Sequence, residues 1–166
     1  MGKITILSCQ EVDLGTGAVL FAFQTAAAGS AASNVRVKRL EVTQNGSTTL
    51  DMVRLEMATR DTAGTLTMTS TTPKTINPLG GAASGLSGNT APAGGTGRSG
   101  TNSSADSGGT YTNVAYVDAA NLNGYLWKPD PSEEIWVPPS TLFVVRFPAN
   151  PSSLLDWGGM LVLEEF

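Results

Sequence analysis

Short apolar runs and alternating apolar and polar positions recur along this chain, and both patterns are typical of β-strands. The runs 141–147 and 159–163 are almost uninterrupted and are bounded by proline and glycine. A helix would need about ten or more residues with a 3.6-residue period, so buried strands explain these runs better. Val53, Leu55 and Met57 alternate with polar residues, which predicts a strand with one exposed face.

Further strands are predicted where weaker versions of these patterns lie between turn residues. They cover residues 3–8, 18–24, 35–43, 65–70 and 111–117. About eight to ten short strands, regularly spaced turns and no amphipathic helix predict an all-β protein, a jelly-roll-like antiparallel β-sandwich. The 166 residues fit one domain, 1–166, and we expect its core in residues 121–166, where all three tryptophans lie.

A phase change in the apolar positions predicts a β-bulge in the third of these strands. Val35 and Val37 share one face of a strand, whereas Leu40 and Val42 have the opposite parity. One extra residue near Lys38-Arg39 would return all four apolar side chains to the core.

Asn45-Gly46 is the strongest turn signal in the chain, because this pair favours the tight turn of a β-hairpin. It lies between the predicted strand 35–43 and the strand that contains Val53. The sequence therefore predicts that these two strands pair as a hairpin.

Residues 73–110 differ from the rest, since they consist largely of Gly, Ala, Ser, Thr and Asn. Such a composition offers little apolar surface to offset the entropy of ordering it, so the segment is predicted to be a long flexible loop inserted in the domain. Loops of this length are uncommon in compact domains unless they are functional or disordered. Two interpretations stay open: a tolerated surface insertion, or an arm that becomes ordered against a neighbouring subunit.

Composition narrows the classes of partner. Charged residues make up only 14% of the chain, the formal net charge is −4 and the pI is about 4.7, so nucleic acid is not an expected partner. The chain has no secretory signal and no apolar run of about twenty residues, so we expect synthesis in the cytoplasm and no membrane insertion. Cys9 is the only cysteine, which excludes an intrachain disulfide and favours a small buried hydrophobic role.

The absence of histidine removes the commonest general base and metal ligand. We expect no enzyme, no catalytic residue, no cofactor and no bound metal. Asp118, Asp130, Asp156 and the pairs Glu133-Glu134 and Glu164-Glu165 could in principle supply a glycosidase carboxylate pair. Adjacent strand residues face opposite sides, so neither Glu-Glu pair can form it alone.

The stretch 95–100 satisfies the dinucleotide-binding pattern G-x-G-x-x-G. This pattern has meaning only between a strand and a helix, and neither is predicted on the required side. We interpret it as a chance match in a glycine-rich tract.

Aromatic residues give the best candidates for a binding surface. Tyr125, Trp127, Trp136 and Trp157 could form a platform on which sugars stack, and Tyr125 and Trp127 would share one side of a strand. The alternative, which we prefer, is that one or two are core residues and the others pack between subunits. Arg146, within an apolar run, is expected to face solvent or a partner carboxylate. These five residues are the candidate interface.

The C-terminal block also carries a recognisable pattern of aromatic, proline and acidic positions. Its members are Asp118, Asn121, Gly124-Tyr125-Leu126-Trp127, Pro129, Pro131, Glu133-Glu134, Leu142, Val144-Val145, Pro148-Ala149, Pro151, Gly159, Leu161 and Leu163-Glu164-Glu165. This pattern resembles small β-rich proteins encoded among the structural genes of tailed bacteriophages. The similarity is weaker over residues 36–60, and Ser132 and the long loop up to residue 110 depart from the pattern.

This resemblance implies a virion component, specifically a head decoration or cement protein without catalytic residues. Such a protein would form a homotrimer on the capsid surface and bind across neighbouring major capsid subunits, so that many weak contacts act together. The alternative is a carbohydrate-binding jelly-roll module of a phage tail or fibre. Tryptophan fluorescence distinguishes the two, because a stacked sugar changes the emission of the ring that it covers.

Overall fold

The computed structural model describes residues 2–15, 18–60, 65–76, 83–88, 97–107 and 109–166, and β-strands are the main regular secondary structure in these segments. None of their helical turns is long and apolar enough to cross a membrane. The elements are β1 (Lys3–Val12), β2 (Val19–Gln24), β3 (Val35–Gln44), β4 (Met52–Arg60), β5 (Thr65–Ser70), β6 (Lys74–Thr75), β7 (Ser87–Gly88), β8 (Arg98–Ser107), β9 (Tyr111–Ala120), the 3₁₀ turn η1 (Asn121–Asn123), β10 (Tyr125–Trp127), β11 (Ile135–Val137), β12 (Leu142–Arg146) and β13 (Trp157–Glu165).

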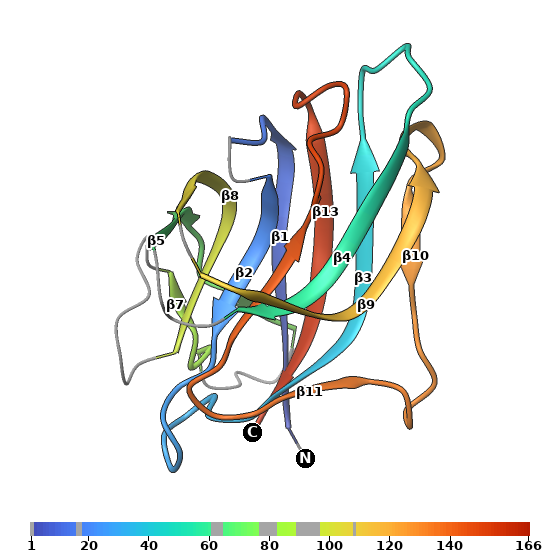
Figure 1. Cartoon of the computed structure of the whole chain (residues 1–166). Helices are drawn as coiled ribbons and strands as arrows, with labels where there is room; N and C mark the ends of the chain where they lie inside the picture. Colours follow the sequence, from blue (N-terminus) through green and yellow to red (C-terminus); the bar gives the residue numbers. More distant parts are fainter. Residues whose placement is uncertain (1, 16–17, 61–64, 77–82, 89–96, 108) are drawn as a thin grey trace.

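Two sheets pack face to face (Figure 1). The first sheet has the order β10-β3-β13-β1-β6, with β11 also on β3, and the second has the order β5-β8-β2-β12-β4-β9, with β7 on β8. Strands β1 to β4 alternate between the sheets along the chain, and β9, β10, β12 and β13 alternate again. These eight strands form the double Greek key of a jelly roll, so the predicted fold class is confirmed.

The core lies between the sheets and is filled by large side chains from both. Phe21, Phe23, Phe143 and Trp157 are fully buried there, and the Phe23 and Phe143 ring centroids are 5.2 Å apart. Burying an aromatic or aliphatic side chain of this size contributes about 1.5–3 kcal/mol. The packing of these side chains between the sheets therefore stabilises the fold.

A second apolar cluster explains why β2 and β12 are apolar on both faces. Leu66 and Met68 of β5 pack with Val19, Leu142 and Val144 on the outer side of the second sheet. Strands covered on both faces read as continuous apolar runs and not as alternating ones. The insertion between β4 and β9 thus covers part of the sheet.

The predicted β-bulge in β3 is confirmed. Arg39 pairs with Val162 of β13, but the next pair joins Val37 to Leu163, so Lys38 is the extra residue. The insertion returns the apolar side chains on both sides of it to the core, where they are buried.

The predicted hairpin at Asn45-Gly46 is wrong, because β3 and β4 lie in different sheets. Gly46 does adopt a positive φ of 77°, so the turn chemistry is present. The Asn45 N–H, however, donates to the carbonyl oxygen of Asp156 at 2.9 Å and not across a hairpin. Residues 45–51 therefore form a crossing between the sheets.

Asn121, in η1, holds this crossing in place from inside. Its Nδ2 donates to Gln44 Oε1 at 2.7 Å and to the Thr49 carbonyl oxygen at 3.0 Å. The Asp51 N–H donates to Asn121 Oδ1 at 2.8 Å, and the Asn121 N–H donates to the Asp51 carbonyl oxygen at 3.0 Å. A buried amide with these partners fixes the end of β3 and the start of β4 together.

The expectation of one flexible loop over residues 73–110 is wrong for much of that segment. Residues 98–107 form β8, which pairs with both β2 and β5, and β6 and β7 are short strands; residues 77–82, 89–96 and 108 lie outside the described residues. The small residues permit close packing: a Cβ added at Gly100 would lie 2.6 Å from the Met68 Cβ. Because Gly100 lies within β8, the end of the G-x-G-x-x-G pattern is part of a strand and not of the helix that a dinucleotide site would need.

Glu165 fixes residues 83–86 against the first sheet. Its buried carboxylate accepts hydrogen bonds from Thr5 Oγ1 at 2.8 Å and from the Gly85 N–H at 2.7 Å, and Ser84 Oγ donates to it as well. Leu86, next in the chain, is fully buried in the core. One buried acidic residue therefore holds the segment that carries a core side chain.

Candidate functional site

Three of the five candidate interface residues are not presented on the surface as a platform. Trp157 is 1% exposed, its ring centroid is 4.5 Å from that of Phe147, and its Nε1 donates to the Ser153 carbonyl oxygen at 2.9 Å. Tyr125 and Trp127 share one side of β10, as predicted, but both pack against the core. Burial raises the pKa of the Tyr125 phenol. A shared sugar platform of all four rings is therefore excluded.

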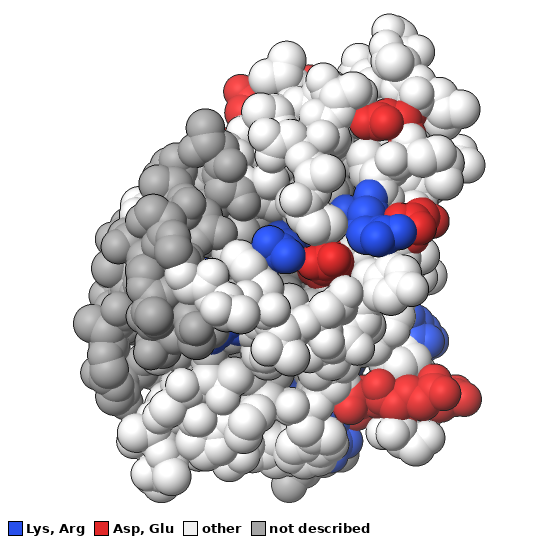
Figure 2. Space-filling view, in the orientation of Figure 1, with Lys and Arg blue, Asp and Glu red and all other residues white. Residues whose placement is uncertain are grey.

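Arg146 faces a carboxylate, but that carboxylate belongs to the same chain. Glu56 lies directly opposite on β4, and its Oε2 accepts from Arg146 Nε at 3.2 Å and from Nη2 at 2.9 Å. The Arg146 guanidinium also lies 3.8 Å from the Tyr111 ring centroid. Figure 2 shows that positive and negative side chains on this face lie in adjacent groups.

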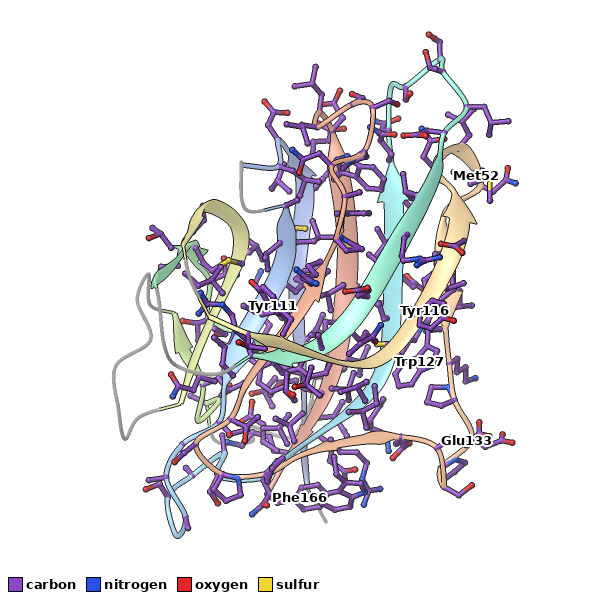
Figure 3. All side chains as sticks on the ribbon, viewed as in Figure 1. Met52, Tyr111, Tyr116, Trp127, Glu133 and Phe166 are labelled. Carbon is purple, nitrogen blue, oxygen red and sulfur yellow. The ribbon has the colours of Figure 1, made fainter. Side chains whose placement is uncertain are left out.

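Trp136 is the candidate that remains exposed, and it is part of what we call the aromatic cluster: Trp136, Phe166 and Arg36. The Trp136 and Phe166 side chains are 54% and 44% exposed and their rings are stacked, 5.2 Å apart at 20°. The Arg36 guanidinium lies 4.0 Å from the indole centroid. In Figure 3, Phe166 lies at one end of the molecule, away from Trp127.

The backbone places the three side chains together. Trp136 of β11 pairs directly with Arg36 of β3, and the Phe166 N–H donates to the Asn34 carbonyl oxygen at 3.0 Å. Residues directly opposite in an antiparallel pair have neighbouring side chains on the same face. The cluster is thus positioned by the sheet and does not depend on a loop.

Arg36 and Phe166 lie on the same side of the Trp136 indole. The separations within the cluster are 4.0 Å for Arg36 to Trp136, 5.2 Å for Phe166 to Trp136 and 5.4 Å for Arg36 to Phe166. If Arg36 and Phe166 lay on opposite faces of the indole, the separation between Arg36 and Phe166 would be much larger than either of their separations from the indole. Because it is not, both lie toward one side of the ring, and neither covers the opposite face.

Ion pairs hold Arg36 in its place beside the indole. Glu134 accepts from Arg36 Nη1 at 3.1 Å and lies 3.0 Å from Lys38 Nζ, while Glu164 lies 3.3 Å from Lys38 Nζ and 3.7 Å from Arg36 Nη1. The hydrogen bond to Glu134 raises the pKa of Lys38. Two cations and two carboxylates balance, so the surface beside the aromatic cluster carries no net charge.

Among the acidic candidates, only Glu134 and Glu164 come close together, and both are paired with Arg36 and Lys38. Arg54 Nε and Nη2 donate to both Asp118 oxygens at 2.8 Å and 3.1 Å and lower the pKa of that carboxyl, which opposes a general-acid role. Glu164 lies on the outer face with its cations, whereas Glu165 is buried, as the alternation of a strand predicted. Two carboxylates, Glu11 and Asp156, line a hollow of about 360 Å³ at one end of β1.

Sequence reasoning missed Arg36 and Phe166 as members of the site. Each belongs to a different strand or chain segment from Trp136, and nothing local in the sequence links them. The only available signal was the alternation in β3, which places Arg36 on the outer face between the buried Val35 and Val37.

Comparison with protein-family models, with curated proteins and with solved structures finds no match to this chain.

Proposed function

We propose that this protein is a structural component of a phage virion, a decoration or cement protein of the head that binds across neighbouring major capsid subunits. The observation that carries the proposal is the aromatic cluster, in which Trp136 and Phe166 are exposed and stack beside the half-buried Arg36. Tryptophan and arginine are the residue types most enriched among the energetic centres of protein interfaces.

The cluster is suited to binding because little has to change when a partner covers it. Glu134 and the stacked rings already restrict the Arg36 side chain, so little conformational entropy is left to lose. The charges beside it are compensated within the chain, so covering them leaves no isolated ion. A neutral, apolar-centred surface on the partner fits best.

The fold is compatible with this role but does not establish it. Jelly rolls occur in viral capsid proteins and also in lectins. This is an analogy at the level of the fold, and function depends on the site. The resemblance of the C-terminal block to phage structural proteins favours the capsid member of that pair.

Repeated copies on a shell would make weak single contacts sufficient. Each further contact made by the same particle becomes intramolecular and gains from a high effective concentration. The homotrimer implied by the resemblance stays a prediction.

The proposal is tested by sedimenting purified phage heads with increasing amounts of the protein. Trp136→Ala should weaken binding by about 30-fold or more per site, the effect expected at an interface centre. Leu155→Ala is the matched control, because Leu155 is similarly exposed, at 56%, but lies in the loop before β13. Equal binding by the wild type and Trp136→Ala, or no binding by either, would count against the proposal.

The exposed Trp136 indole also supports a second candidate, a carbohydrate-binding module of a tail or fibre, because a sugar ring could stack on it. Titration with glycans, followed by tryptophan fluorescence, separates the two. A change in emission that is lost in Trp136→Phe, while Trp127 and Trp157 still emit, would favour the carbohydrate role. No change with glycans and tight binding to heads would favour the capsid role.

A further inference from the structure

β9 and β10 form the edges of the two sheets on one flank of the sandwich (Figure 1), and several apolar residues of these strands and of the segments beside them are exposed. Met52 and Tyr116, labelled on this flank in Figure 3, are 65% and 63% exposed. The exposed apolar residues of β4, β9, η1, β10 and the turn before β4 are Leu50, Met52, Val114, Tyr116, Leu122 and Leu126. Met52 and Tyr116 lie on the outer face of the second sheet, whereas Leu126 lies on the outer face of the first sheet, because its neighbours Tyr125 and Trp127 pack against the core. Several exposed apolar side chains on one flank point to an interaction site more than a single one does.

β9 is the longest sheet edge, and among the described residues no strand pairs with its outer side. It has ten residues and pairs only with β4. The opposite edges of the sheets are β6, of two residues, and β5, whose pairing with β8 has two register shifts. β10 and β11 have three residues each. Short or irregular edges resist pairing with another chain, so β9 differs from the rest.

From Ala115 to Ala120, β9 lacks the usual protection of an open edge. It contains no proline, lysine or arginine. Its one acidic residue, Asp118, accepts hydrogen bonds from Nε and Nη2 of Arg54 on the neighbouring strand. The pairing of β9 with β4 is regular from Ala115 to Ala120, with the extra residue of a bulge at Val114. A six-residue stretch of regular, nearly neutral edge is therefore open.

We propose that two copies of this chain associate through β9, which pairs antiparallel with β9 of the second copy about a twofold axis perpendicular to the sheet. A row of unpaired backbone N–H and C=O groups along a regular sheet edge is a template for pairing with a strand of another chain. The two second sheets then form one continuous sheet, and the exposed flanks meet beside it. This inference is independent of the proposed virion role.

Symmetry and charge select the register. A twofold axis of this kind keeps each residue on its own face of the sheet, so only residues of the same parity stand opposite one another. An axis at Asp118 would place two carboxylates together, and an axis at Tyr116 would bring the bulge at Val114 into the pairing. An axis at Val117 avoids both when the pairing runs from Ala115 to Ala119, five of the six residues of the regular stretch.

In this register Tyr116 of each copy stands opposite Asp118 of the other. Arg54, which holds Asp118, already lies 5.1 Å from the Tyr116 ring centroid of its own chain. The second tyrosine would extend the same arrangement of ring, guanidinium and carboxylate across the interface.

The interface is closed by its twofold axis, so it yields a dimer and no filament. Edge pairing thus favours twofold symmetry over the trimer implied by the resemblance.

Sedimentation equilibrium of the full chain over a range of concentrations measures the association. We expect a monomer–dimer equilibrium that Tyr116→Glu weakens about tenfold or more, since it sets two carboxylates opposite each other twice per dimer. Tyr116→Lys, which faces Asp118 with a cation, should retain the dimer. Leu126→Glu, on β10 and 55% exposed, controls for the loss of an apolar residue and should have a smaller effect.

A cross-link locates the axis. Val117→Cys should give a disulfide-linked dimer on mild oxidation, because Val117 would face its own copy, whereas Val114→Cys should cross-link much more slowly. Circular dichroism and the urea midpoint confirm that each variant is folded. A monomer at all concentrations, a trimer, or a dimer that Tyr116→Glu leaves intact and Val117→Cys does not link would overturn the proposal.

Discussion

Asn121→Ala should destabilise the fold strongly, although it removes a small polar side chain outside the apolar core. The substitution deletes three hydrogen bonds, to Gln44 Oε1, to the Thr49 carbonyl oxygen and from the Asp51 N–H. Each contributes about 1 kcal/mol net, and groups left buried without a partner cost more, so we expect a loss of about 2–4 kcal/mol in the free energy of unfolding. For a domain of this size that lowers Tm by about 5–15 °C.

Urea unfolding followed by tryptophan emission measures this loss, because Trp157 is fully buried and reports on the core. The midpoint should fall while the slope with urea stays the same. Asn123→Ala is the matched control, since Asn123 lies in the same 3₁₀ turn but is exposed, and it should change stability by less than about 0.5 kcal/mol. If the two variants lost similar amounts, the sheet crossing at 45–51 would not depend on Asn121.

Two further predictions concern buried ionisable groups. Glu165→Gln should lower the free energy of unfolding by about 1–3 kcal/mol and expose residues 83–86 to hydrogen exchange, because an amide cannot accept from all the donors that face this carboxylate. The control, Glu164→Gln on the outer face, should lower it by less than about 1 kcal/mol. Equal losses for the two variants would contradict the role of Glu165. Burial raises the pKa of the Cys9 thiol to about 12 from 9.0, so its contribution to stability is fully present below pH 9 and is lost as the pH rises toward 12, at up to about 1.4 kcal/mol per pH unit. Urea unfolding at pH 8 and pH 10.5 should show that the free energy of unfolding falls more between these pH values for the wild type than for Cys9→Ala. An equal fall for both proteins would contradict the burial of the thiol.

The sequence predicted those parts of the fold that depend on local pattern. Parity along β3 was enough to locate the bulge at Lys38, because a strand has only two faces. The apolar run of β12 was recognised as a buried strand because it is short, uninterrupted and bounded by proline. The hairpin at Asn45-Gly46 failed because a turn signal specifies a local bend but not which sheet the next strand joins.

The segment 73–110 was misjudged because its apolar surface is supplied by other parts of the chain. β8 has few apolar side chains of its own, but it pairs on both sides, and Leu66, Met68 and Leu86 provide the packing around it. The candidate site was predictable only in part. Trp136 was among the named residues, whereas its contacts with Arg36 and Phe166 arise from strand pairing that one sequence does not display.

The central claim, that the aromatic cluster is the surface covered by a protein shell, is tested most directly by hydroxyl-radical footprinting of the protein free and bound to purified heads. The proposal predicts that oxidation of Trp136 and Phe166 falls severalfold on binding, while the exposed Leu155 reacts equally in both states. Trp136 that is as reactive on the heads as in solution, or a protein that does not bind heads at all, would contradict the claim.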